Sequence, residues 1–272
     1  MNRIDERFLK LRGAGLPAFI PFLAAGDPDL ETTGRLLRVC EECGADAIEL
    51  GFPYSDPIAD GPTIQEAFVR ALGRGVRLEE IFRTVERARR EGTSIPIVAM
   101  LSYSLVYRMG LEGFVRRAAK AGLDGATVPD LPVEEAEELE RIARKQDFHL
   151  IYLVAPTTDE ARRKRILKRA GGFIYYVSVR GITGVRSGIA EDLAEKIAGL
   201  RAEAKAPVAV GFGIGSAEQA AAVAHLADGV IVGSAIVKLV AEKAKEGSDA
   251  VVKAVGALVR ELSAATKSVG GG

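Results

Sequence analysis

One acidic residue stands inside an apolar run that reads as a buried strand. Glu49 lies in the segment Ala47–Leu50, where every other side chain is apolar. A buried carboxylate is costly unless it is paired or used, and its removal from water raises its pKa toward the range of a general acid or base. A structural carboxylate paired with an arginine would give the same pattern, so both interpretations stay open at this point.

The loop that follows, GFPYSDPIADGPT, carries two more acids, Asp56 and Asp60. Its prolines and glycines predict a stiff, shaped excursion. Such a loop can fold over the site and bring one carboxylate toward Glu49, so that two carboxyl groups in different environments divide the acid and base roles. We expect Asp56 to make turn hydrogen bonds only, whereas the sequence leaves the role of Asp60 undecided.

Three glycine-rich segments follow three consecutive predicted strands. They are Gly181–Gly184, Gly211–Ser216 and Gly233–Ala235, and the last opens a helical pattern over Ile236–Lys245. Glycines let backbone N–H groups approach a phosphate closely, and a helix N-terminus favours the anion. None of these segments contains a lysine, so we predict a phosphate site that is formed by backbone dipoles.

The other predicted strand ends are apolar or aromatic, which suits a flat hydrophobic ligand, although the deeper side chains would simply fill the interior. These residues are Phe22, Met100, Thr127, Leu153, Tyr175 and Phe212. Neither His149 nor His225 falls at a strand end, so we interpret both as structural. The sequence therefore supports neither a Ser/His/Asp hydrolase nor a metal site.

Short apolar runs must position these residues, and they alternate with longer helical patterns. The predicted strands are Ala18–Leu23, Asp46–Leu50, Pro96–Leu101, Gly125–Pro129, His149–Val154, Gly172–Val179, Pro207–Phe212 and Gly229–Val232. Helical patterns between them include Glu31–Cys43, Glu79–Arg90 and Val133–Lys145. This alternation predicts parallel strands with crossover helices. An open doubly wound sheet would carry its phosphate signal after the first strand, whereas the signals here follow the last three, as in a closed (β/α)8 TIM barrel.

The length of 272 residues suits one such barrel. We predict a single domain over residues 1–272, with an N-terminal helix at about 1–12 and a flexible tail at about 266–272. The amphipathic segment Asp5–Leu11, with Phe8, Leu9 and Leu11 on one side, is expected to close the barrel floor. The surplus length lies in loops inserted after the second and sixth strands, the first of which leads into a predicted helix from Gln65 to about Leu72.

Composition narrows the classes of protein further. The formal net charge is zero, which argues against a polyanionic main partner. Neither a secretory signal nor a spanning apolar stretch is evident, so we expect a cytoplasmic protein. Cys40 and Cys43 form a C-x-x-C at the end of a predicted helix, where the dipole does not favour a thiolate, so we interpret them as structural. The single Asn and the abundance of charged residues fit a thermophilic source, whereas a GC-rich genome would also explain why Arg outnumbers Lys. The chain lacks Trp.

The segment ADAIELGFPYSDPIADGPTIQ closely resembles the signature of the tryptophan synthase alpha subunit family. Further motifs occur along the chain in the family's order, the first of them before this segment: PAFIPFLAAGDPD, VPDLPVEEAEEL, LVAPTTDEARRKRI, FIYYVSVRGITG, VGFGIGSAEQ and VGSAIVKLV. The resemblance implies a retro-aldol cleavage of indole-3-glycerol phosphate to indole and glyceraldehyde 3-phosphate. It also implies a beta-subunit partner in an alpha2-beta2 complex. The beta subunit would carry pyridoxal phosphate and receive the indole, whereas this chain would hold neither a cofactor nor a metal.

The resemblance assigns roles by position. Glu49 would be the catalytic acid/base, Asp60 the acid at the indole N–H, and Tyr175 the aromatic residue beside the substrate. The phosphate grip would comprise Gly184, Gly213, Gly233 and Ser234, and the indole pocket Phe22, Leu153, Phe212 and Thr183. Loops 51–62 and 181–188 would face the partner, and Ser104 stands where relatives often carry Asn.

The sequence leaves two other hypotheses about function open. One is another phosphate-sugar barrel, either an isomerase or a flavin enzyme, because one barrel fold serves many chemistries. The other is a catalytically quiet subunit that only activates its partner, against which the presence of both Glu49 and Asp60 argues.

Overall fold

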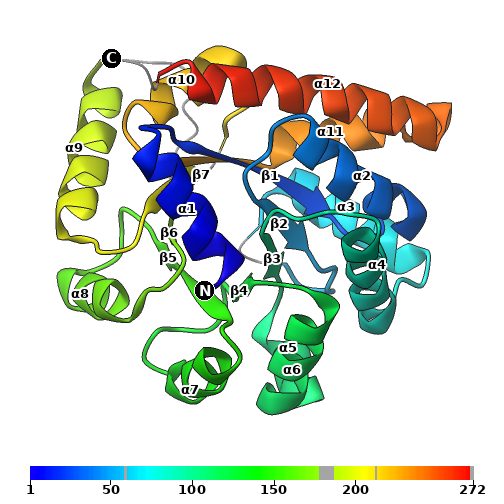
Figure 1. The fold of residues 1–272 in the computed structure, drawn as a ribbon, viewed down its shortest axis with the longest axis horizontal. Coiled ribbons are helices and arrows are strands. Elements are labelled where there is room, and N and C mark those ends of the chain that lie inside the picture. Colours follow the sequence, from blue (N-terminus) through cyan, green and yellow to red (C-terminus); the bar gives the residue numbers. More distant parts are fainter. Residues whose placement is uncertain (58–59, 178–186, 212, 270–272) are drawn as a thin grey trace.

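The computed structural model describes residues 1–57, 60–177, 187–211 and 213–269, and the strands in these ranges close into a parallel barrel (Figure 1). They are β1 Ala18–Ala24, β2 Ile48–Gly51, β3 Ile97–Met100, β4 Gly125–Thr127, β5 His149–Val154, β6 Ile174–Val177, β7 Val208–Gly211 and β8 Gly229–Val232. Each strand pairs with the next, and β1 also pairs with β8. The predicted (β/α)8 barrel is confirmed, and each predicted strand is found.

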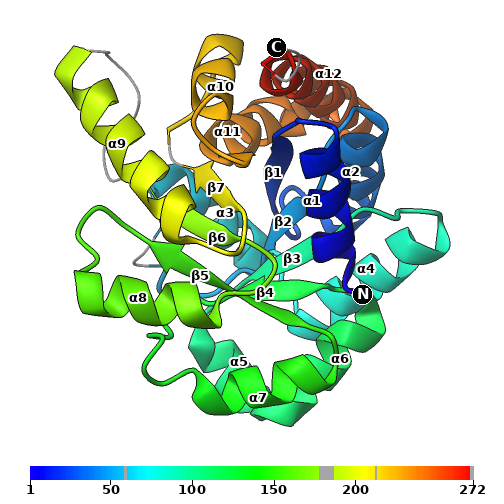
Figure 2. The same cartoon turned by 60° about the vertical axis from the view of Figure 1, so that its left-hand side comes forward.

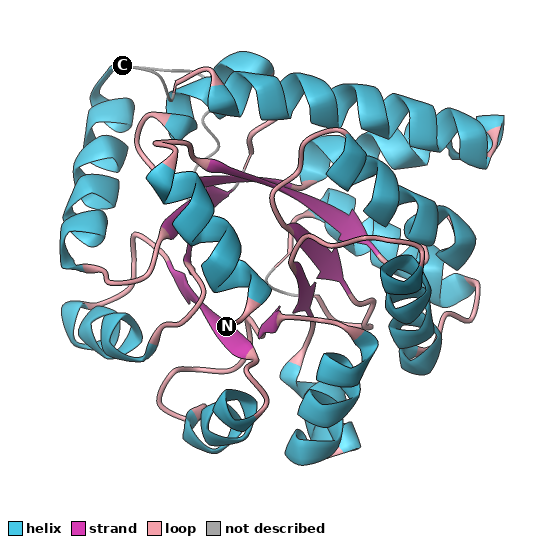
Figure 3. Ribbon diagram, viewed as in Figure 1, coloured by secondary structure: helices cyan, strands magenta, loops and turns pink. Residues whose placement is uncertain are grey.

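Helices surround this barrel and cover its outer face (Figure 3). They are α1 Arg3–Gly13, α2 Leu30–Glu42, α3 Pro62–Gly73, α4 Leu78–Arg90, α5 Tyr103–Met109, α6 Leu111–Ala121, α7 Glu137–Lys145, α8 Glu160–Arg169, α9 Ser187–Glu203, α10 Ala217–Ala224, α11 Ser234–Lys243 and α12 Ser248–Lys267. The main apolar core lies between these helices and the sheet. Because both faces of the sheet are covered, the strands are mostly apolar, and every residue of β1 is buried.

Several predicted boundaries shift for local reasons. β2 begins at Ile48 because Asp46, predicted as strand, instead accepts hydrogen bonds on its carboxylate from the Phe19 N–H and from Arg7. The helix predicted from Val133 begins at Glu137, after turns over 133–135. The last helix continues to Lys267, whose ammonium donates to the Gly44 carbonyl, so helical structure enters the segment that we expected to be a tail.

Helix α1 lies across the amino-terminal end of the barrel (Figures 1 and 2). Its buried residues Ile4, Phe8 and Leu11 join the core inside the barrel, where the Phe8 ring contacts Phe173 at 5.6 Å between centroids. The prediction that this helix closes the floor is confirmed, but its predicted apolar face was partly wrong. Leu9 is 62% exposed, because the inward face repeats at spacings of three and four residues from Ile4.

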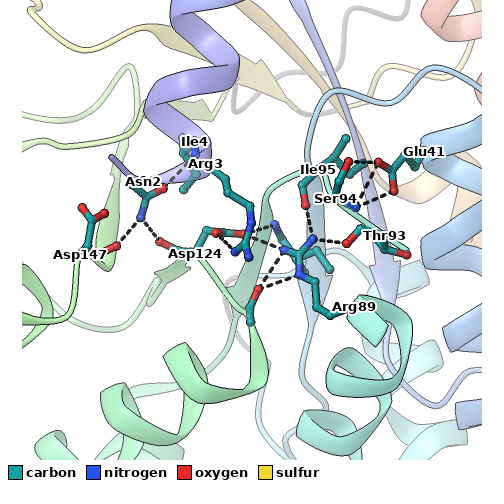
Figure 4. A network of polar contacts seen from close by, with 12 residues as sticks. Asn2, Arg3, Ile4, Glu41, Arg89, Thr93, Ser94, Ile95, Asp124 and Asp147 are labelled. Carbon is teal, nitrogen blue, oxygen red and sulfur yellow. Dashed lines mark hydrogen bonds and ion pairs between the residues drawn. The ribbon is translucent and has the colours of Figure 1, made fainter. Parts of the chain in front are cut away.

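A polar network fastens this floor (Figure 4). The buried Asp124 carboxylate accepts hydrogen bonds from Arg3 at 2.7 Å, from Arg89 at 2.8 Å and from the Ile97 N–H at 2.9 Å. Asn2 caps α1 with its side-chain oxygen and donates its amide to the carbonyls of Asp124 and Asp147. Burial lowers the pKa of Arg89 to about 10, so its guanidinium stays charged at neutral pH. The network therefore ties the N-terminus to the starts of β3, β4 and β5.

Replacing Asp124 by Asn should destabilise the barrel by about 3 kcal/mol, because it leaves the Arg89 charge buried without its counter-ion. Thermal and urea unfolding followed by circular dichroism would measure the loss. The matched control is Asp249→Asn, since Asp249 pairs with Arg35 but its side chain is 93% exposed. That variant should stay within about 0.5 kcal/mol of the parent chain. Equal stability of the two variants would contradict a stabilising role for the network.

The two cysteines lie where α2 ends. Cys40 and Cys43 are both buried and carry free thiols. Burial, the larger effect, and the neighbouring Cys43 both raise the pKa of the Cys40 thiol well above its ordinary value. A protonated, buried thiol is unreactive, which supports the structural interpretation of Cys40. In the described part of the chain, no helix has the length and apolar character needed to span a membrane.

Candidate active site

A cavity of about 270 Å³ opens at the carboxyl ends of the strands. Glu49, Asp60 and Tyr175 line it together with apolar side chains from β1, β3, β5 and β8. These apolar residues are Phe22, Met100, Leu153 and Ile231, and Pro129 and Ile64 complete the wall. The structure therefore brings together residues from sequence positions more than a hundred apart.

A larger hollow of about 670 Å³ lies at the opposite end of the barrel. It is open to solvent between the C-terminal ends of α1, α9 and α10, and its Arg and Lys residues Arg12, Arg201 and Lys205 are exposed. In (β/α)8 enzymes the chemistry takes place at the carboxyl ends of the strands. We therefore assign the smaller cavity, which contains the buried acids, as the candidate active site.

Glu49 is held on β2 between Phe22 of β1 and Val98 of β3. It is only 1% exposed, and the Thr127 hydroxyl donates to its Oε1 at 3.1 Å. Burial raises the pKa of Glu49 to about 8, and the negative charge of Asp60 adds to this effect against the opposing hydrogen bond from Thr127. No arginine pairs with Glu49 among the described ion pairs, so the structural alternative to a catalytic role finds no support.

Asp60 reaches the same cavity from the loop between β2 and α3. Burial raises the pKa of Asp60 to about 6, although a hydrogen bond from the Tyr54 hydroxyl at 3.2 Å opposes the shift. Asp56 is exposed, lies outside the cavity lining, and accepts a hydrogen bond from Ser55. The loop therefore presents one of its two acids to the cavity, and that acid is Asp60.

Two glycines make room for the aromatic side chains of the site. A Cβ on Gly51 would lie 2.4 Å from the Phe22 ring, and a Cβ on Gly211 would lie 2.7 Å from the Tyr175 hydroxyl oxygen. Sequence reasoning placed Gly211 with a phosphate loop, whereas its position in β7 gives space to Tyr175. Burial, with the charges of Glu49 and Asp60, raises the pKa of Tyr175 well above its ordinary value, so the phenol stays protonated.

The other end of the cavity is shaped by backbone. Gly213, Gly233 and Ser234 line it, and α11 begins at Ser234 with Gly233 as its N-cap. Gly213 has a φ of +70°, which glycine adopts without strain. The N-terminus of α11 thus supplies the helix dipole and free N–H groups that favour an anion. Thr183, Gly184 and Phe212, predicted for the same site, lie outside the described residues.

The two histidines lie outside the lining of this cavity. His149 makes a 2.8 Å hydrogen bond with Asp5 at the floor, and His225 caps the end of α10. In the parts of the chain described, His, Cys, Asp and Glu side chains form no group that could hold a metal ion. Tyr54, which sequence reasoning did not single out, donates a hydrogen bond to the carboxylate of a cavity acid.

Comparisons with known proteins agree with this architecture. A family model described as tryptophan synthase alpha chain matches residues 8–267. The tryptophan synthase alpha chain of Rhodopirellula baltica is 46% identical over 257 residues, covering 92% of each chain. That of Geotalea uraniireducens is 45% identical over 271 residues, covering 100% of each chain.

Solved structures give the same result. Tryptophan synthase subunit alpha from Legionella pneumophila superposes with a TM-score of 0.90 at 36% identity, covering 98% of each chain. A chain of tryptophan synthase from M. tuberculosis, in an open form with BRD0059 bound, has a TM-score of 0.86 at 34% identity and covers 98% of this chain and 99% of that chain. The likeness extends over the whole barrel.

Proposed function

The chain belongs to the tryptophan synthase alpha chain family, and we propose that its cavity is where indole-3-glycerol phosphate is cleaved to indole and glyceraldehyde 3-phosphate. This aldolase-type cleavage is the reaction of the family and serves tryptophan biosynthesis. The observation that carries the proposal is the pair of acids in one cavity with separated pKa values, about 8 for Glu49 and about 6 for Asp60. At neutral pH one is a proton donor and the other an anion, as the reaction requires.

The first step is a proton transfer to the indole ring. The neutral Glu49 carboxyl donates its proton to the ring carbon that carries the glycerol phosphate side chain. The ring then holds a positive charge shared with its N–H, and the Asp60 carboxylate stabilises that charge by accepting the N–H hydrogen bond. Tyr175, whose phenol remains neutral, forms an aromatic wall beside the ring.

The second step breaks the carbon–carbon bond. The Glu49 carboxylate now takes the proton from the side-chain hydroxyl next to the ring, and the oxygen becomes the aldehyde of glyceraldehyde 3-phosphate. The electron pair of the broken bond returns to the ring and neutralises it as indole. Glu49 is protonated again at the end, so a single carboxyl serves both transfers.

Binding divides between the two ends of the cavity. The apolar wall of Phe22 and Leu153 suits the indole ring, and the start of α11 at Gly233 and Ser234 suits the phosphate. Gly213 belongs to the same phosphate end. We propose the corresponding roles for Gly184 in the phosphate grip and for Phe212 and Thr183 in the indole pocket.

Membership of the family implies a beta-subunit partner. We propose an alpha2-beta2 assembly in which pyridoxal phosphate resides in the beta subunit, and in which the loop from Gly51 to Pro62 faces the partner. Ser104, where relatives often carry Asn, is exposed on the first turn of α5. We propose that the groups that carry out the cleavage all belong to this chain. We also propose that the protein acts in the cytoplasm.

Indole release from indole-3-glycerol phosphate tests the proposal, with the purified chain alone and with a beta subunit. We expect kcat/KM to follow a bell-shaped pH profile with its maximum at about pH 7. It should fall below about pH 6 as Asp60 takes up a proton, and above about pH 8 as Glu49 loses one.

Three outcomes would contradict this assignment. Absence of indole release in both conditions would refute the cleavage. If the chain released no indole but still stimulated the beta subunit, it would be a catalytically inactive subunit that only activates its partner. An isomerised sugar phosphate without indole would instead support the isomerase alternative.

A further inference from the structure

Tyr54 contacts Asp60 from behind the cavity. Its hydroxyl donates to Asp60 Oδ2 at 3.2 Å, yet Tyr54 is not part of the cavity wall. Its half-buried ring packs on the buried Phe68 of α3, with 5.5 Å between centroids and 50° between planes. The ring is thus anchored on a helix while its hydroxyl reaches the carboxylate.

The backbone of Asp60 is fixed separately. Its N–H donates to the Pro57 carbonyl at 3.0 Å, and the Gln65 side-chain amide donates to the carbonyls of Asp60 at 2.8 Å and Pro57 at 3.1 Å. These bonds tie the loop to the first turns of α3. They leave the direction of the carboxylate free, because they involve only main-chain atoms of Asp60.

We propose that Tyr54 is a positioning residue for the cleavage, whose hydroxyl fixes the direction of the Asp60 carboxylate and keeps it ionised for the indole N–H. The inference rests on the proposed function for the role of Asp60 in turnover. One carboxylate oxygen is occupied by Tyr54, which leaves the other to accept from the substrate. A site held in its productive geometry before substrate arrives avoids reorganisation during the reaction.

The charged groups around Asp60 give the hydrogen bond an electrostatic consequence. Glu49 and Tyr175 share the cavity with Asp60, and the charge of Asp130 acts on Tyr54 from the β4 side. Burial raises the pKa of Asp60, and the Tyr54 hydrogen bond is the interaction that lowers it. Loss of the hydroxyl should therefore raise the pKa of Asp60 further.

The test is Tyr54→Phe, which keeps the ring on Phe68 and removes only the hydroxyl. We expect the acid limb of the kcat/KM profile to move up by about one pH unit, the size of shift that one hydrogen bond to a charged group produces. The loss in kcat/KM should be about fivefold at pH 6, approach tenfold at lower pH, and be much smaller at pH 8, where Asp60 is ionised in either chain. The loss should appear mainly in kcat.

The matched control is Tyr107→Phe, assayed in the isolated chain, because Tyr107 is 71% exposed and its change is chemically the same. It should leave the profile unchanged. A Tyr54→Phe profile identical to that of the parent chain would overturn the proposal, and so would a loss that is equal at every pH.

A second measurement does not depend on turnover. Titration of the Asp60 carboxyl by carbon NMR, assigned with Asp60→Asn, should give a higher pKa in Tyr54→Phe than in the parent chain. An unchanged pKa would refute the positioning role. Absence of indole release by the parent chain would refute the proposed function instead, so the two failures are distinguishable.

Discussion

Replacing Glu49 by Gln should lower kcat for indole release by about a thousandfold or more, near the upper range for loss of a general acid–base group. Gln has the same shape and can still accept the Thr127 hydrogen bond, but it neither gives nor takes a proton. Both transfers of the proposed reaction fail together. Substrate affinity should change by less than about threefold, because the carboxyl contributes mainly in the transition state.

Steady-state kinetics and calorimetric binding of the uncleaved substrate would separate these effects. The matched control is Glu91→Gln, because Glu91 lies where α4 ends and its side chain is 42% exposed in a pair with Arg38. That variant should retain the parent kcat. Comparable turnover by Glu49→Gln would refute the acid–base role.

Replacing Asp60 by Asn should lower kcat by about a hundredfold to a thousandfold, the magnitude expected when one preorganised electrostatic partner is removed. Asn can still accept a hydrogen bond from the indole N–H, but it brings no negative charge to the charged ring. The variant should also lose the acid limb of the kcat/KM profile, since the group with a pKa of about 6 is gone. The alkaline limb from Glu49 should remain.

A control lies in the same loop. Asp56→Asn makes the same change at an exposed position outside the cavity wall, and in the isolated chain it should leave both kcat and the profile unchanged. An acid limb that persists in Asp60→Asn would show that another group controls it. Equal losses in the two variants would indicate a general effect on the loop.

The sequence predicted the barrel because each strand is buried on both faces and must be apolar along its length. Glu49 was recognisable for the same reason, as the acid within an apolar strand. The strand boundaries were less predictable. Asp46 directly precedes the apolar run of β2 and was assigned to that strand, but its carboxylate accepts a hydrogen bond from the backbone of β1. Leu9 was misplaced on the inward face because three apolar residues within four positions do not define the helix face without Ile4.

For the candidate site, the sequence was informative through residue types and less so through position. Glycine clusters after the last strands indicated backbone contacts, but sequence could not separate Gly213, which lines the cavity, from Gly211, which accommodates a ring. Tyr54 could not be found by spacing. Its contact with Asp60 joins two loop residues six positions apart, and loop conformation is not encoded in a periodic pattern.

The neutral state of Glu49 also links folding to proton uptake. Its pKa is about 8 in the folded chain, against an ordinary value of 4.5. Between these values the folded barrel retains a proton that the unfolded chain has released, so its contribution to the free energy of unfolding decreases as the pH rises. The carboxyl that supplies the proton for the reaction thus favours the native barrel on the acidic side of its working range and weakens it on the alkaline side.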